Sequence, residues 1–160
     1  MQKNIYKWVA AFFFSFCCSD LLAQEKYEKE SRIPQEEVPP KAVRFIDSLT
    51  EKKKLRWYFE EGINRTSIEA KFKKDKRNYS VEFDTLGNVE DVEIEINLNE
   101  LDTQLKEAIN SQLKVNCLKS KIEKVQIQLS GSEHALISKL KNEQSYPNLI
   151  IKYEIVVRCT

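Results

Sequence analysis

Residues that could do covalent chemistry are few in this chain. Histidine occurs once, at His134, and no serine or cysteine in a recognisable nucleophile setting lies near it in the sequence. Nucleophilic catalysis needs a nucleophile, a base and a group that orients the base. A lone histidine without such neighbours is typical of a surface or capping residue. The sequence therefore predicts a protein that is not an enzyme and that uses no cofactor.

Carboxylates offer a second kind of chemistry, as general acids and bases or as metal ligands. Four of them fall where neighbouring strands could gather them on one sheet face: Glu82, Asp84, Glu93 and Glu95. Lys71 and Lys73 lie on the adjacent predicted strand with matching parity, so a cross-strand charge ladder is the simpler interpretation. The cysteines and the single histidine supply too few ligands at their spacings for a metal site. We therefore predict no metal.

The N-terminus indicates a secretory signal peptide over residues 1–23. Two lysines precede an apolar run over residues 8–18, and Ala23 offers a small residue for cleavage. The run is too short for a stable membrane span. A retained anchor or core helix, or a lipid anchor on Cys17 or Cys18, is the alternative. The predicted location is periplasmic or secreted, with no membrane span after the signal is removed.

Removal of the signal leaves two cysteines, Cys117 and Cys159. An exported compartment permits a disulfide between them, and closing a loop of that length would contribute roughly 4 kcal/mol. Two separate, partly buried thiols are the alternative. The sequence leaves both open.

Composition places limits on the class of protein. The chain has 160 residues, of which 26 are basic, 25 are acidic and 41% are apolar, which fits one globular domain with a modest core. A net charge of +1 argues against a dedicated nucleic-acid binder, because such proteins usually carry a basic excess. Residues 24–37 are almost all Gln, Glu, Lys, Ser and Arg, so we predict a disordered, solvated tether there.

Alternating apolar and polar residues predict an antiparallel meander between Thr66 and Asn97. The alternation occurs over residues 68–73, 79–84 and 92–97. One face of such a sheet is apolar and must be covered, and the other is a charged ladder that faces water. A glycine, Gly87, lies between the last two stretches and can take the positive φ of a tight hairpin.

Two helices with apolar stripes are predicted, and strands follow each of them. The first helix begins at Pro40 and precedes a strand from Leu55 to Glu60. The second has Asn99 as its N-cap and precedes strands over residues 124–129 and 149–157. Residues 132–145 fit a short helix or an irregular strand. The predicted core contains Val43, Phe45, Leu49, Trp57, Phe72, Val81, Phe83 and Ile94.

This order of elements predicts an α+β fold of tandem helix-plus-antiparallel-sheet repeats, with the helices packed on one face of the sheet. The first repeat spans residues 38–98. The second spans residues 99–160 and is incomplete, because no final strand follows its last one.

Three segments in this order resemble the PepSY-like, or beta-lactamase-inhibitor-protein-like, family of exported bacterial proteins. They are Pro39 to Phe45, Leu55-Arg56-Trp57, and Tyr79 to Asn88 with its Tyr-x-Val-x-Phe-Asp-x-x-Gly hairpin. The resemblance covers residues 38–131 well and the tail weakly. It implies a two-copy α+β fold in the periplasm or outside the cell, and it carries over no catalytic residues.

The polar face of the sheet is the predicted binding surface, because Tyr and Arg are favoured anchors at protein interfaces. Its predicted residues are Arg56, Tyr58, Glu69, Lys71, Glu82 and Glu93. For Tyr58, a half-buried edge aromatic is the alternative. We predict an exported protein-binding module that inhibits or modulates an envelope protein. A structural or sensory envelope protein that binds peptides or an envelope partner is the alternative function.

Overall fold

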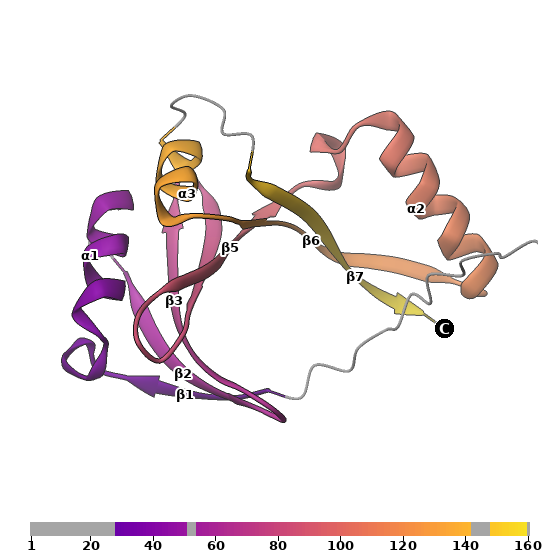
Figure 1. The fold of residues 1–160 in the computed structure, drawn as a ribbon. Coiled ribbons are helices and arrows are strands. Elements are labelled where there is room, and N and C mark those ends of the chain that lie inside the picture. Colours follow the sequence, from indigo (N-terminus) through magenta and orange to yellow (C-terminus); the bar gives the residue numbers. More distant parts are fainter. Residues whose placement is uncertain (1–27, 51–53, 142–147, 160) are drawn as a thin grey trace, which may run out of the picture.

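A computed structural model describes residues 28–50, 54–141 and 148–159. The predicted signal peptide, residues 1–23, lies outside this part of the chain. The described residues form an α+β fold (Figure 1), as predicted. Its elements are Glu28–Ile33 (β1), Gln35–Glu37 (η1, a 3-10 turn), Pro40–Leu49 (α1), Arg56–Gly62 (β2), Thr66–Lys74 (β3), Arg77–Phe83 (β4), Val89–Ile96 (β5), Leu98–Glu100 (η2, a 3-10 turn), Thr103–Asn116 (α2), Ser120–Ser130 (β6), Glu133–Leu140 (α3) and Ile150–Cys159 (β7).

The strands form one sheet in the order β1-β2-β3-β4-β5-β6-β7, and each pair of neighbours is antiparallel. The predicted meander is therefore confirmed, and it extends in both directions beyond the stretch where the alternation is strongest. The tandem repeats and the packing of all helices on one face stay predictions.

The predicted disordered tether over residues 24–37 needs correction. From residue 28 onward the chain forms β1 and η1, and β1 pairs with β2 along its length, from Glu28 opposite Gly62 to Ile33 opposite Trp57. Its polar composition is compatible with a strand, because charged side chains suit an edge strand. Backbone hydrogen bonds to β2, which composition does not reveal, order this segment.

The N-cap of the second helix also differs from the prediction. Asp102, not Asn99, caps α2, and its carboxylate accepts a hydrogen bond from the Leu105 amide at 2.8 Å. Asn99 lies inside η2, which Asn97 and Glu100 close with reciprocal hydrogen bonds. Several neighbouring polar side chains can occupy an N-cap position, so residue type alone does not decide which of them caps the helix. The 3-10 turn that precedes α2 makes the helix begin later in the chain than predicted.

The ambiguous segment contains a helix, α3. The Ser132 hydroxyl accepts a hydrogen bond from the Ala135 amide at 3.3 Å, which is an N-cap. Leu136 of α3 is completely buried in the main core. Residues 142–147 lie outside the described part of the chain.

The main core lies between α1, α3 and the sheet. At its centre Phe83 contacts two aromatic rings, with its centroid 5.6 Å from that of Phe45 and 6.0 Å from that of Trp57. The predicted core is confirmed: Phe45, Leu49, Trp57, Phe72, Val81 and Phe83 are buried, and Val43 and Ile94 are partly buried against them.

A second, smaller core lies beneath α2. Its buried members are Ile96, Leu101 and Val125, and Leu105 and Ile109 of α2 pack against them. No side chain of α2 is itself fully buried. Packing therefore holds α2 less firmly than α1.

The β4–β5 turn is fastened to the start of α1. The Asp84 carboxylate accepts hydrogen bonds from the backbone amides of Leu86 and Asn88 and from the Asn88 side chain, and these bonds lower the pKa of Asp84. Lys41 of α1 donates to Asn88 Oδ1 at 2.6 Å. Gly87 has φ +82°, and a Cβ placed there would lie 2.9 Å from Pro39 Cβ and 3.0 Å from the Ala42 nitrogen.

Replacing Gly87 by alanine should therefore destabilise the protein by roughly 1 to 3 kcal/mol, from positive φ and from close contact with α1. Denaturant unfolding measures this change. Leu86→Ala is the matched control, because Leu86 is 75% exposed in the same turn, and its effect should be small. Equal losses in the two variants would show that neither the backbone conformation nor the contact with α1 matters.

Candidate protein-binding surface

The polar face of the sheet brings the six predicted residues together in two adjacent cross-strand rows. In one row Arg56 lies opposite Lys71, Lys71 opposite Ser80, and Ser80 opposite Glu93. In the next, Tyr58 lies opposite Glu69, which lies opposite Glu82. The four strands β2 to β5 thus hold these side chains side by side, because residues directly opposite in antiparallel strands point to the same face.

An ion-pair network lies at the centre of this face. Lys71 Nζ is 2.7 Å from a carboxylate oxygen of Glu30 and 2.7 Å from one of Glu69. The same ammonium lies 4.9 Å from the centre of the Tyr58 ring, which is a cation–π contact. The Ser80 hydroxyl donates a hydrogen bond to Glu69. Glu69 and Lys71 therefore already have partners within the chain.

Burial makes this network unusual for a sheet face. Glu69 is 8% exposed, and Glu60 beside it is 4% exposed. Burial alone would raise the pKa of Glu69, but a hydrogen bond shared with Glu60 and those donated by Lys71 and Ser80 outweigh it and lower that pKa. Burial opposes the charge on Lys71, yet its bonds to Glu30 and Glu69 raise the pKa of the ammonium. Each charge is thus stabilised by its neighbours.

Carboxylate oxygens of Glu30, Glu60 and Glu69 lie within 4.8 Å of one another. Carboxylates grouped in this way can hold a cation. Here Lys71 contacts two of the three, so its ammonium partly balances their charge. The sequence did not single out Glu30 and Glu60. The signal that could have found them is the parity that Glu60 shares with Tyr58, together with the pairing of β1, which places Glu30 opposite Glu60.

Two other predicted anchors are also held by side chains of the same chain. Arg65 donates hydrogen bonds to Glu82 and, at 3.0 Å, to Glu90. Gln126 of β6 donates to Glu93 at 2.8 Å. Glu82 and Glu93 are therefore parts of the face's internal network, whereas Arg56 and Tyr58 remain the predicted residues best placed to contact a partner.

Beside the network lies a hollow of about 530 Å³ that is rich in basic side chains. We name as the basic hollow the site lined by Lys54, Arg56, Lys73 and Lys124, together with Lys71. The first four form no ion pair with an acidic residue in the described part of the chain. One acid, Glu95, lines the same hollow and accepts a hydrogen bond from Asn78 at 2.7 Å.

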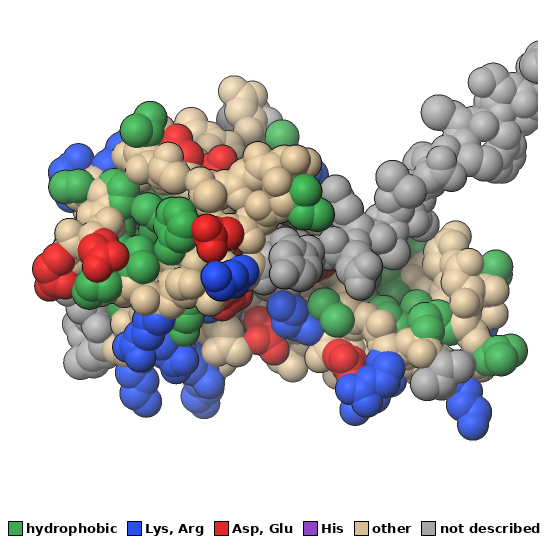
Figure 2. All heavy atoms as spheres, turned by 90° about the horizontal axis from the view of Figure 1, so that it is seen from below, with side chains coloured by type: hydrophobic (Ala, Val, Ile, Leu, Met, Phe, Trp, Pro, Cys, Tyr) green, Lys and Arg blue, Asp and Glu red, His purple; other side chains and the backbone are tan. Residues whose placement is uncertain are grey.

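The basic side chains of the hollow come from separated parts of the sequence. Lys54 precedes β2, Arg56 begins it, Lys73 lies near the end of β3, and Lys124 lies on β6. The antiparallel order of the strands brings these positions to one part of the sheet. On the surface viewed in Figure 2, Lys and Arg side chains likewise gather along one border, where acidic side chains are fewer.

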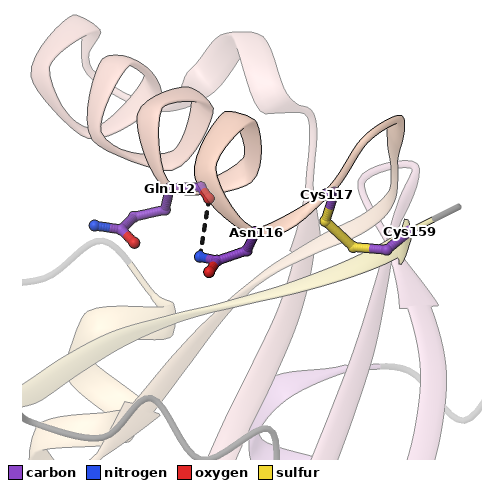
Figure 3. The surroundings of a disulfide bond; sticks show 4 residues. All are labelled: Gln112, Asn116, Cys117 and Cys159. Atoms are coloured by element: carbon purple, nitrogen blue, oxygen red, sulfur yellow. Dashed lines mark hydrogen bonds between the residues drawn. A yellow bond between two sulfur atoms is a disulfide. The ribbon is translucent and has the colours of Figure 1, made fainter.

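The remaining candidates for chemistry lie elsewhere. His134 is exposed in the first turn of α3. A disulfide joins Cys117, at the end of α2, to Cys159, the last residue of β7, with the Cα atoms 5.4 Å apart. Figure 3 shows this bond beside Asn116, whose side chain donates to the Gln112 carbonyl at 2.9 Å. The structure thus contains the bridge that the sequence left open.

Replacing Lys71 by methionine should lower the free energy of unfolding at pH 7 by about 1 to 3 kcal/mol, less than for a fully buried pair because Lys71 is partly exposed. The loss arises because Glu69 keeps its charge in a buried site without its ammonium partner. A carboxyl group whose pKa is lowered in the folded protein stabilises the fold at pH values above its ordinary pKa, which for glutamate is 4.5. This stabilisation is lost as the pH falls through the pKa that the group has in the folded protein. The difference between variant and parent should therefore shrink below pH 4.5.

Unfolding in denaturant at a series of pH values checks this prediction. Lys73→Met is the control, since Lys73 is exposed on the same strand and makes no ion pair with a described residue. Its effect should stay within about 0.5 kcal/mol at every pH. A Lys71→Met loss that does not change with pH would contradict the role given to Glu69.

Within the described residues no helix combines the length and the apolar character needed to cross a membrane. The chain matches no protein-family model, no curated protein and no solved structure. The PepSY-like resemblance therefore stays a prediction.

Proposed function

We propose that this chain is an exported, non-enzymatic protein-binding module whose polar sheet face binds an anionic segment of a cell-envelope protein, which it inhibits or modulates. The observation that supports the proposal is the basic hollow, where four basic side chains lie together without an acidic partner among the described residues. Like charges that repel one another are stabilised when an oppositely charged ligand binds between them.

The anionic character of the partner follows from the contrast between the two parts of the face. Elsewhere on the face every predicted acidic anchor already has a partner within the chain: Glu69 has Lys71, Glu82 has Arg65, and Glu93 has Gln126. In the basic hollow the charge is left over. A partner that supplies carboxylates therefore gains ion pairs without breaking those within the sheet.

A protein segment fits this site better than a nucleic acid does. The net charge of the chain is only +1, whereas nucleic-acid binding depends on a general excess of positive charge. Arg56 at the hollow and Tyr58 beside Lys71 add the two residue types that most often anchor protein interfaces. Acidic side chains spaced along an extended peptide can reach several of the lysines at once.

A direct test measures binding of a fluorescein-labelled oligoglutamate peptide to the purified protein by fluorescence anisotropy, with an oligoglutamine peptide of equal length for comparison. We expect binding of oligoglutamate alone, weakening as salt is added. The double variant Arg56→Glu/Lys124→Glu should reduce the affinity at least about tenfold. Thermal unfolding of this variant should stay close to that of the parent, because both side chains are exposed.

The matched control is Lys106→Glu/Lys114→Glu, which makes the same change in net charge on α2, outside the hollow. It should bind oligoglutamate with an affinity close to that of the parent. Equal losses in the two double variants would mean that only net charge matters, and the proposed site would then be wrong. Unchanged binding after Arg56→Glu/Lys124→Glu would overturn the proposal as well.

A further inference from the structure

The last strand, β7, is a long and apolar edge of the sheet. It pairs with β6 on one side, and in the described part of the chain no strand covers its other side (Figure 1). Its exposed apolar side chains are Ile150 (56% exposed), Ile151 (48%), Tyr153 (44%) and Val156 (37%). Exposed edge strands are templates for pairing, and proteins usually protect them with charge or short length. The opposite edge, β1, is shorter and mostly charged.

Two of the three charged residues of β7 flank Tyr153 symmetrically, and the third, Arg158, pairs with Glu123 of β6. Lys152 precedes Tyr153 and Glu154 follows it. A two-fold axis through Tyr153, perpendicular to the sheet, would place a second copy of β7 antiparallel to the first. Lys152 would then lie opposite the second copy's Glu154, and the axis repeats this contact. Opposite charges in directly opposed positions stabilise an antiparallel pair.

The apolar residues follow the same symmetry. In this register Ile151 lies opposite Ile155, and Ile150 lies opposite Val156. Side-chain direction also agrees, because β7 pairs with β6 so that Ile151 and Ile155 lie opposite Leu129 and Val125 of the core side. Each pair therefore joins two apolar side chains on the same face of the extended sheet.

Neighbouring registers lack this complementarity. An axis through Lys152 places that lysine opposite itself, and an axis through Glu154 does the same with the glutamate. Like charges in directly opposed positions destabilise strand pairs. Only the register centred on Tyr153 pairs both charges with their opposites.

The two charges beside Tyr153, Lys152 and Glu154, have no competing partner among the described residues. Across the β6–β7 ladder Lys152 lies opposite Gln128 and Glu154 opposite Gln126, and both neighbours are neutral amides. Neither charge forms an ion pair with another described residue. The charge pattern of β7 therefore suits a contact outside the protomer.

From these observations we propose that two copies of this chain associate through antiparallel pairing of their β7 strands, centred on Tyr153, to form one continuous sheet. The contact uses the outer edge of β7, whose residues do not line the basic hollow. It is thus independent of the proposed binding of an anionic segment.

Charge reversal tests both the association and its register. Sedimentation of the purified protein over a range of concentrations should show a monomer–dimer equilibrium. Lys152→Glu alone places two glutamates opposite each other at each contact, and Glu154→Lys alone places two lysines there. Each variant should raise the dimer dissociation constant by about tenfold or more, since the axis repeats each repulsion.

Mixing the two variants in equal amounts should restore dimers, because every glutamate of one chain then faces a lysine of the other. The double variant Lys152→Glu/Glu154→Lys should likewise dimerise about as well as the parent. Circular dichroism and thermal unfolding should show that every variant is folded, as expected when the neighbours on β6 are neutral. A parent that sediments as a monomer at all concentrations would overturn the proposal. So would single variants that dimerise like the parent, or a mixture that stays monomeric.

Discussion

Replacing Phe83 by alanine should lower the free energy of unfolding by about 3 to 5 kcal/mol, the largest single-residue effect that we expect. Phe83 is completely buried between Phe45 of α1 and Trp57 of β2. Removing its ring takes apolar surface out of the core and leaves a cavity that rigid neighbours on a helix and on two strands cannot close. It also removes two aromatic contacts.

Denaturant unfolding followed by tryptophan fluorescence checks this prediction, because Trp57 lies beside the deleted ring. Leu118→Ala is the control, since Leu118 is 99% exposed, and it should change the stability by less than about 0.5 kcal/mol. A loss below 1 kcal/mol for Phe83→Ala would show that Phe83 does not lie in a packed core between α1 and the sheet.

Removing the disulfide should have the second large effect. The variant Cys117→Ser/Cys159→Ser should be less stable by about 4 kcal/mol, because the unfolded chain gains the freedom of an open loop. The bridge closes a separation of 42 residues. It also ties α2, which has no fully buried side chain, to the end of β7. We therefore expect α2 to loosen first, seen as faster amide hydrogen exchange in Thr103–Asn116 than in α1.

Peptide mass mapping under non-reducing conditions should find the fragments that contain Cys117 and Cys159 joined. Adding reductant should destabilise the parent and leave the double serine variant unchanged, which serves as the control. Two thiols that react freely with an alkylating agent in the native protein would contradict the bridge.

The sequence by itself determined the elements that local pattern specifies. Period-two alternation predicted β2 to β5, because side chains of a strand point alternately to its two faces. The aromatic residue at 83 and its neighbours were expected in the core on the same ground. Gly87 was expected in a turn because few other residues take its φ, and the turn is there. These features depend on residues close together in the chain.

Tertiary structure alone decided the features that join distant segments. β1 has no apolar pattern of its own, and only its ladder with β2 makes it a strand. That ladder brings Glu30 to Glu60 and to the Glu69–Lys71 pair, so the predicted anchor Glu69 is itself buried within a network of charged side chains. No spacing in the sequence foretells such a contact.

The basic hollow shows the same limit. Arg56 was predicted from its parity, but Lys54 and Lys124 lie 70 positions apart in the sequence and meet in one hollow. Their meeting depends on the register of every strand between β2 and β6, and register is set by pairing, which is a non-local property. The alternation therefore predicted which residues would face outward, and only the folded sheet decided which of them would be left without a partner.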